Sequence, residues 1–501
     1  MASVDWNVEP NGSAPRFEPI DRQQVVLEPL DIERLIPAEH PARSIWEILG
    51  RLDLRRFLGT MKSVEGHAGR NVWEPRLLIA MWIYAYSRGI FSAREIERQC
   101  AYEPALRWLT GLKVVNHHTL SDFRIEHGEA LQNLFVQVLG ILTMEKLVTL
   151  ERVTVDGTKV RACVNKKTFS RAHKIREHLT LAREHVEELQ REEAEQEKRG
   201  RQAAARKRAA RERVERLEGA LAEVERLQAD KKWERDKPCQ ASTSDADAQF
   251  MRTSDHGLAP AYNVQLTADA QHKLIVGVEV SKRPSDSGHL LPALDRVKRQ
   301  LGRFPQQAVA DGDYTTREAV VGAGERGVDF YGSWNEASPQ WLGHGIAPAY
   351  APAAFPYDAQ RNEMICPEGR RLRYKTTLHR AGGLAIHVYA AASEDCRRCR
   401  KRPLCSPQNA MTKHGRAVSV RLEPEAVERY HKKMAADEAK AIYKQRAPVA
   451  EFPHAWLKDK LKFVRLRCRG IAKAKAEAEA FWVCLTYNLQ RYFKLRCPAT
   501  A

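Results

Sequence analysis

The sequence of 501 residues lacks any apolar run that approaches a membrane-spanning helix, which needs roughly 18 consecutive apolar residues. Its first residues, MASVDWNVEPNGSAPRFEP, lack the basic and then apolar pattern of a secretory signal. We therefore expect a cytoplasmic protein rather than a membrane or secreted one. In that compartment, cysteines are expected to be reduced, buried or metal-bound rather than paired in disulfides, and the chain has ten of them.

The chain has fewer acidic residues than basic ones. Asp and Glu number 64 against 82 Lys and Arg, which gives a formal net charge of +18. A surface with this excess attracts polyanions, so nucleic acid is the leading candidate partner. Ordinary solubility charges would produce the same balance, and charge alone therefore leaves both interpretations open.

The hydrophobic pattern changes several times along the chain and predicts a multidomain α+β protein. A charged segment between residues 172 and 237 has apolar positions spaced by three and four, which favours two helices in an antiparallel hairpin, with one long helix as the alternative. The predicted units are an extended arm (1–41), a helical DNA-binding domain (42–150), a mixed α/β catalytic core (151–171 and 238–334), the coiled-coil insertion (172–237), an irregular Cys-rich insertion (335–422) and C-terminal helices (423–501).

Two aspartates stand in apolar strand patterns of the predicted core. Asp156 lies within the segment RVTVDGTKVRA (152–162), and Asp311 ends the strand that begins at Gln307. An ionised carboxylate in such surroundings costs several kcal/mol unless it is paired or metal-bound. Either aspartate alone could be a turn former or a helix cap. Two of them in strands of one predicted sheet indicate a shared site.

Glu451 is the third candidate carboxylate, in the segment YKQRAPVAEFPHAWLKDK (443–460). Only the fold could bring it close to Asp156 and Asp311. Three converging carboxylates would hold two Mg²⁺ or Mn²⁺ ions, which are hard cations that prefer oxygen ligands. Such a pair of ions supports in-line displacement at a phosphodiester without a covalent protein nucleophile.

At these residues the sequence resembles the Asp-Asp-Glu (DDE) transposases of bacterial insertion sequences, over most of its length. In the N-terminal part the resemblance rests on GRNVWEPRLLIAMWIYAYSRGIFSAREIERQC (69–100) and HHTLSDFRIEH (117–127). In the catalytic part it rests on TVDGTKVRA (154–162), VADGDY (309–314), YKQRAPVAEFPHAWLK (443–458) and FWVCLTYNLQRYFKL (481–495).

The resemblance implies a ribonuclease H-like catalytic domain in which Asp156, Asp311 and Glu451 are the catalytic, metal-binding residues. It also implies that the family's DNA-contacting residues around its glutamate correspond to Tyr443, Arg446 and Lys458. Two departures stand out. Four residues separate Arg446 from Glu451 where the usual pattern has three, and the second motif is Asp-Gly-Asp-Tyr rather than Asp-x-Gly-Tyr. Asp313 thus competes with Asp311, and we prefer Asp311 because it directly ends the strand.

Four of the cysteines have the spacing of a zinc site. A Cys-Pro-x-Gly turn is followed by a Cys-x-x-Cys pair and a further cysteine, at positions Cys366, Cys396, Cys399 and Cys405. This pattern predicts a structural Zn²⁺ bound by four thiolates. Because only one Cys-x-x-Cys pair is present, reduced and metal-free cysteines are the alternative.

Basic residues outside the motif supply further candidate DNA contacts. In the C-terminal part they are Arg465, Arg467 and Arg469, whose position beyond Glu451 favours contact with phosphates over a plain solvated face. In the N-terminal part, a helix-turn-helix interpretation of residues 117–127 places Arg124 near DNA. An ordinary capped bundle helix explains the same residues.

The sequence therefore predicts a transposase that binds double-stranded DNA at the terminal inverted repeats of its element and at its target. We expect it to cleave and join strands as a homo-oligomer. One alternative is a metal-dependent nuclease of the same fold that hydrolyses DNA without joining it. Another is a non-catalytic DNA-binding derivative, against which the three intact acidic positions argue.

Overall fold

The computed structural model describes residues 23, 25, 29–59, 72–195, 201–230, 239–253, 257–334, 344–379, 384–409, 414–469 and 475–496. Most of the predicted arm (1–41) falls outside these ranges. Within them, no helix combines the length and the apolar character that crossing a membrane would require.

The N-terminal part is helical, as the sequence predicts. It begins with two 3₁₀ turns, η1 (Ile32–Leu35) and η2 (Arg55–Phe57), and its helices are α1 (Pro41–Leu49), α2 (Pro75–Ser87), α3 (Ala93–Gln99), α4 (Pro104–Thr110), α5 (His117–Glu126) and α6 (Gly128–Met144). Three of them start on proline, whose fixed φ suits the first helical position. The side chain of Asn116 caps α5 by accepting the N–H of His118 at 2.8 Å.

A six-stranded sheet lies at the centre of the chain. Its strands are β1 (Arg152–Arg161), β4 (Gln249–Arg252), β5 (Leu258–Asp269), β6 (Ile275–Ser281), β7 (Gln307–Ala310) and β8 (Asp329–Gly332). The order is β4-β5-β1-β7-β8, with β6 also paired to β5. Strand β5 is antiparallel to both β1 and β6, whereas β7 runs parallel to β1 and β8 runs parallel to β7. Helices α9 (Leu290–Leu301) and α10 (Arg317–Glu325) connect the later strands.

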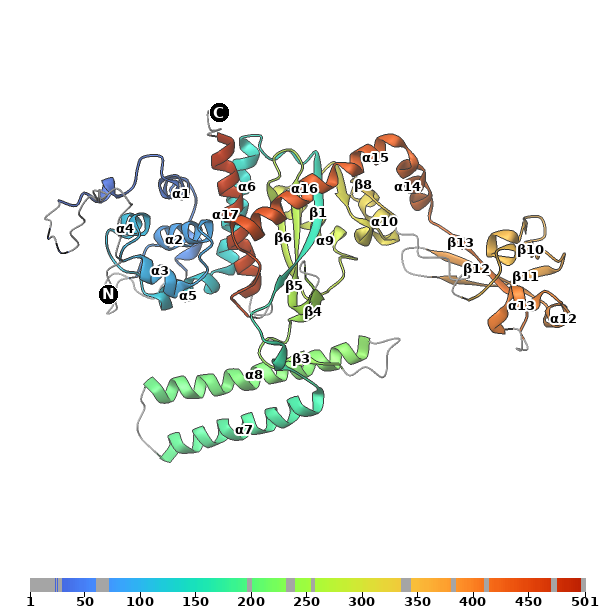
Figure 1. The fold of residues 1–501 in the computed structure, drawn as a ribbon, viewed down its shortest axis with the longest axis horizontal. Helices are drawn as coiled ribbons and strands as arrows, with labels where there is room; N and C mark the ends of the chain where they lie inside the picture. The colour runs from blue at the N-terminus through green and yellow to red at the C-terminus, as the bar shows by residue number, and fades with distance from the viewer. Residues whose placement is uncertain are drawn as a thin grey trace, which may run out of the picture.

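The last helix, α17 (Lys475–Arg496), joins the N-terminal helices to the sheet. It packs on α2 and α6 on one side and on β6 on the other, as Figure 1 shows. Consecutive residues of this helix are fully buried, from Phe481 to Leu485. A helix that is apolar all round is covered on all sides. The N-terminal helices and the sheet consequently share one continuous hydrophobic core.

The charged insertion forms two helices, α7 (Ala172–Glu195) and α8 (Arg201–Asp230), which pack side by side (Figure 1). Arg176 pairs with Glu225, and Arg183 pairs with Glu218, so the helices run antiparallel. Of the two predicted alternatives, an antiparallel hairpin and one long helix, the structure has the hairpin. At its base, β2 (Phe169–Ser170), which follows the 3₁₀ turn η3 (Lys166–Thr168), pairs with β3 (Ala241–Ser242).

The Cys-rich insertion is not irregular as expected but contains an antiparallel five-stranded sheet. The strands are β9 (Tyr357–Asp358), β10 (Glu363–Ile365), β11 (Arg371–His379), β12 (Ala385–Ala391) and β13 (Ala417–Leu422). Its short helices are α12 (Ser393–Arg397) and α13 (Arg402–Cys405), with 3₁₀ turns η5 (Pro348–Tyr350), η6 (Pro352–Ala354) and η8 (Pro407–Asn409). Most residues of β11 are exposed, and the strand therefore lacks the apolar alternation from which a strand is recognised.

The chain then returns to the central sheet through three helices. They are α14 (Glu425–Ala435), α15 (Asp437–Lys444) and α16 (Arg446–Ala455), and a π-helical turn, η9 (Trp456–Lys460), continues the last of them. Helix α16 lies against β1 and β5, where it crosses the sheet in Figure 1. Glu451 thus returns to the strands that carry the two aspartates.

Candidate active site

Asp156 and Asp311 lie side by side on the central strands. Val155 of β1 is the register partner of Ala310 of β7, and each aspartate directly follows its member of this pair. Asp311 ends its strand and accepts the N–H of Asp313 at 3.0 Å, so that it also caps a 3₁₀ turn, η4 (Gly312–Tyr314). Asp313 is exposed, whereas Asp311 is partly buried. The parallel register therefore brings together two of the three predicted carboxylates.

The two carboxylates influence each other's protonation. Burial raises the pKa of Asp311, and the negative charge of Asp156 raises it further against the opposing N–H of Asp313. Burial would also raise the pKa of Asp156, but the hydrogen bond and charge of His454 hold it below its usual range. The pKa values of the two carboxylates thus shift in opposite directions, because burial dominates at Asp311 whereas His454 pairs with Asp156. A bound cation would relieve their repulsion.

Helix α16 covers this pair with basic side chains. The positive charge of Arg446 acts on both Asp156 and Asp311. His454 Nε2 lies 3.5 Å from Asp156 Oδ2, while His454 Nδ1 is buried and has no hydrogen-bond partner within the described ranges. His454 is not among the residues predicted from the sequence, and its only sequence signal is its position one helical turn beyond Glu451.

Glu451 occupies the same helix as His454, three residues earlier. At a rise of about 1.5 Å per residue this places it about one turn from the contact with Asp156. Its side chain is exposed, and in the part of the chain that the structure describes it makes no hydrogen bond or ion pair. No other described protein group therefore occupies its oxygens.

The other motif residues lie around the same helix. Tyr443 donates its hydroxyl to Ser333 at 3.1 Å, and the Arg446 guanidinium carbon lies 5.9 Å from the Tyr443 ring centroid. Lys458 is half-buried in the π-helical turn; burial lowers its pKa, while Asp459 and Asp156 act in the opposite direction. Pro453 interrupts the hydrogen bonding of α16 just before that turn, which alters the spacing of side chains beyond it.

A polar network centred on Asp286, which was not predicted from the sequence, supports the site. Asp286 accepts hydrogen bonds from Lys159 Nζ at 2.9 Å, Asn263 Nδ2 at 2.6 Å and Gln265 Nε2 at 2.7 Å. The Tyr314 hydroxyl donates to Gln265 Oε1. The alternation of Asn263 and Gln265 with apolar residues along β5 suggests a solvent-facing strand side, yet both are buried. Pairing with Asp286 is what makes their burial tolerable.

No three His, Cys, Asp or Glu side chains within the described ranges converge closely enough to hold a metal ion as they stand. The donor chemistry nevertheless fits Mg²⁺ or Mn²⁺. Two carboxylates stand side by side, and the third is exposed on helix α16, one helical turn before the residue that contacts Asp156.

The arginines predicted to contact DNA form an exposed loop beside β1. Arg465 donates to the backbone oxygen of Ala162 at 3.3 Å, and Arg469 donates to that of Cys163 at 3.0 Å. The N–H groups of Arg467 and Cys468 are held by the buried carboxylate of Glu479, at 2.8 and 2.9 Å. Alternate residues, Leu466 and Cys468, are buried, so the three arginines point outward.

Arg124 corrects one expectation. Its side chain is only 8% exposed, donates to the backbone oxygen of Phe91 at 2.9 Å and stacks over Trp82 with 4.7 Å between the guanidinium carbon and the ring centroid. It is held inside the protein by apolar and polar contacts between helices. We therefore do not count Arg124 among the DNA contacts.

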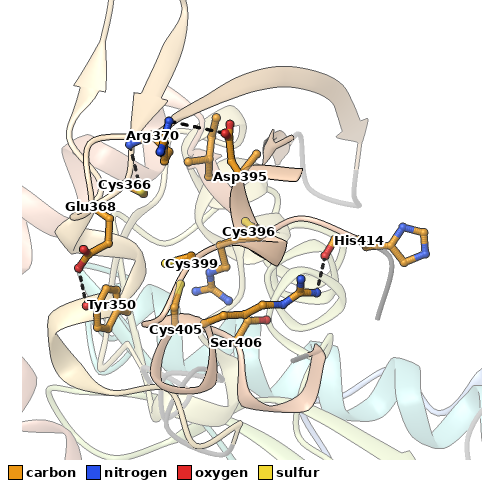
Figure 2. A pocket seen from close by; sticks show the side chains of 14 residues that line it. Tyr350, Cys366, Glu368, Arg370, Asp395, Cys396, Cys399, Cys405, Ser406 and His414 are labelled. Carbon is orange, nitrogen blue, oxygen red and sulfur yellow. Dashed lines mark hydrogen bonds and ion pairs between the residues drawn. The ribbon is translucent and has the colours of Figure 1, made fainter. Parts of the chain in front are cut away.

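The four predicted zinc ligands line one cavity in the Cys-rich module, by which we mean residues 344–422. Cys366 follows β10, Cys396 and Cys399 come from α12 and the residues after it, and Cys405 ends α13. Figure 2 shows the four side chains around a common space. The described cysteines are all free of disulfides.

Two family models match the chain. A transposase DDE domain matches residues 365–493, from the Cys-rich module through Glu451 to α17, and a transposase domain (DUF772) matches residues 30–126. The N-terminal and C-terminal parts of the chain are thus each similar to a transposase domain. More particularly, the matches confirm its resemblance to the DDE-type transposases of insertion sequences. Searches among curated proteins and solved structures found no match.

Proposed function

We propose that this chain is a DNA transposase that cleaves the terminal inverted repeats of an insertion sequence and joins them to target DNA. The observation that carries the proposal is the side-by-side placement of Asp156 and Asp311 against the helix that bears Glu451. The match of a transposase DDE domain over that helix supports it independently.

The sheet supports a ribonuclease H-like catalytic domain. Three antiparallel strands in the order β6-β5-β1 continue into the parallel strands β7 and β8. A mixed sheet of this kind is what the resemblance to DDE transposases leads us to expect for the catalytic core. Asp156 on the central strand and Asp311 on its parallel neighbour then occupy the middle of the sheet, where helix α16 reaches both.

Asp156, Asp311 and Glu451 would hold two Mg²⁺ or Mn²⁺ ions, which when bound activate the attacking oxygen and stabilise the leaving oxygen of a phosphodiester. Cleavage breaks the bond between phosphorus and the 3′ oxygen by attack of water. Strand transfer repeats the displacement with the freed 3′ hydroxyl as nucleophile on a target phosphate.

The basic residues of α16 and the following loop would hold the DNA. Arg446 and Lys458 lie within electrostatic reach of Asp156, so they can pair with phosphate oxygens next to the reacting bond. The exposed side chains of the loop extend this surface along β1, at Arg465, Arg467 and Arg469. An element has two ends, and we propose that a homo-oligomer holds both.

The test uses purified full-length protein, the DNA that flanks its coding sequence and Mg²⁺. A duplex end with a free 3′ hydroxyl is incubated with plasmid, and joined products are counted. We expect joining by the wild type and none by Asp156→Ala, Asp311→Ala or Glu451→Ala, each of which should still bind the end. Hydrolysis without joining would favour a nuclease instead. Full activity of all three variants would refute the two-metal assignment.

A further inference from the structure

The Cys-rich module has little hydrophobic core for its size. Its core cluster has six buried apolar residues, Phe355, Met364, Leu372, Tyr389, Ala391 and Val418, and the other buried apolar residues of the module, Ile346, Tyr350, Ala351 and Leu384, lie outside that cluster. Three of the cysteines, Cys366, Cys396 and Cys405, pack against this small cluster. Small units with so few buried side chains usually need a metal or disulfides to become stable. Since its cysteines are free, the module lacks disulfides.

Two of the sulfurs already accept backbone hydrogen bonds. The N–H of Arg370 donates to Cys366 Sγ at 3.3 Å, and the N–H of Arg416 donates to Cys396 Sγ at 3.2 Å. The first lies in a tight turn, closed by the Gly369 N–H on the Cys366 oxygen at 2.8 Å and by the positive φ of Gly369, 75°. These contacts fix the positions of the Cys366 and Cys396 sulfurs at the cavity.

The cavity between the sulfurs has a volume of about 40 Å³, which suits one ion but no substrate. Arg416 is part of its wall, and Arg416 Nε is buried without a hydrogen-bond partner among the described residues. A cation placed against four neutral thiols has weak acceptors only. Against four thiolates and one divalent ion, which together carry two negative charges, the same cation is stabilised.

We propose that Cys366, Cys396, Cys399 and Cys405 bind one Zn²⁺ as a closed structural site, and that Arg416 offsets part of its negative charge. Binding releases four thiol protons as four sulfur–zinc bonds form. The backbone hydrogen bonds hold the sulfurs of Cys366 and Cys396 in place, and rotation about the Cα–Cβ bond lets the sulfurs of Cys399 and Cys405 adjust to the ion. The closed set of thiolates leaves no open position, so the site stabilises the module and performs no chemistry.

The first test is the metal content of the purified full-length protein. We expect one zinc per chain in the wild type and in Cys163→Ser, a control at a partly exposed cysteine beside the basic loop. Cys399→Ser should lose the zinc and expose residues 344–422 to protease, while the helical hairpin and central sheet remain resistant. Wild-type protein without zinc and with four reactive thiols in the module would overturn the proposal, as would one bound iron in its place.

The second test concerns Arg416 and uses zinc release to a chromogenic chelator. Arg416→Met keeps the volume and removes the charge, and it should release zinc about 10-fold faster or more. Arg416→Lys keeps the charge and should stay closer to the wild type. Equal release rates for the wild type and Arg416→Met would show that Arg416 does not stabilise the site. Neither test depends on DNA cleavage, so their failure is distinct from failure of the proposed transposase activity.

Discussion

Replacing Gly157 by Ala should destabilise the catalytic core, because the position beside Asp156 has no room for a methyl group. A Cβ at Gly157 would lie 2.5 Å from both Asp286 Oδ1 and Gln265 Nε2, and 2.9 Å from Asn263 Oδ1. Comfortable non-bonded contacts need about 3.5 Å or more, so these atoms must retreat by about 1 Å. They are not free to do so, because Asp286 accepts from Asn263, Gln265 and Lys159.

The magnitude follows from those contacts. Overpacking a dense site costs about 1–3 kcal/mol, and weakening a hydrogen bond to a charged group costs about 1.5–3 kcal/mol. The two effects overlap, and we expect a loss of about 2–4 kcal/mol in the free energy of unfolding. At about 2–4 °C per kcal/mol for a domain of this size, the melting temperature should fall by at least about 4 °C.

The matched control is Gly140→Ala, in the interior of α6, where an added Cβ meets nothing within 4 Å. This change should raise stability by about 0.5–1 kcal/mol, since Ala is the better helix former. Both variants are compared with the wild type by thermal melting and urea unfolding. A melting temperature for Gly157→Ala equal to the wild type, or a fall of the same size in both variants, would refute the reasoning.

Three further predictions follow from the site and its surroundings. In a strand-cleavage assay, the folded Asp313→Ala variant should retain substantial activity, whereas Asp311→Ala should not, because only Asp311 is partly buried beside Asp156. The reverse result would show that the second metal ligand is Asp313. In a variant that carries Arg465→Gln, Arg467→Gln and Arg469→Gln, binding to specific and random DNA should weaken about equally, and the slope of log binding constant against log salt concentration should become shallower by up to about 3. A loss of binding confined to terminal-repeat DNA in the same titration would contradict phosphate contact. Burial raises the pKa of Glu479, although the charge of Arg124 and the hydrogen bonds from two backbone N–H groups act in the opposite direction. The contribution of Glu479 to the stability of the fold is therefore full below the ordinary Glu pKa and is lost as pH rises through the raised value. Melting curves of Glu479→Gln should therefore gain on the wild type as pH rises, and a difference that is constant with pH would exclude this effect.

Local sequence was enough to predict the positions of many elements. Strands were predicted around Asp156 and before Asp311, and β1 and β7 are found there. The spacing of apolar residues in 172–237 favoured a hairpin, and α7 and α8 form one. These features depend on residues within a few positions of each other, which is the range over which periodicity and capping act.

The burial of polar side chains in the site depends on the tertiary structure. Asn263 and Gln265 alternate with apolar residues, a pattern typical of a solvent-exposed face, yet Asp286 pairs with both and allows them to be buried. Arg124 has the sequence character of a surface residue but lies among Phe91 and Trp82. In each case the partner is distant in the chain, and no local pattern identifies it.

The sequence by itself determined which residue types were available and, outside the Cys-rich insertion, where most single strands and helices would form. The register of β1 with β7, which sets Asp156 beside Asp311, and the return of α16 onto β1, which brings His454 to Asp156, were decided only by the tertiary structure. The physical reason is that burial of α17 between the N-terminal helices and β6, and of the strands against one another, stabilises one global arrangement. That free energy belongs to contacts between segments hundreds of residues apart, and it has no signature in any short stretch of the chain.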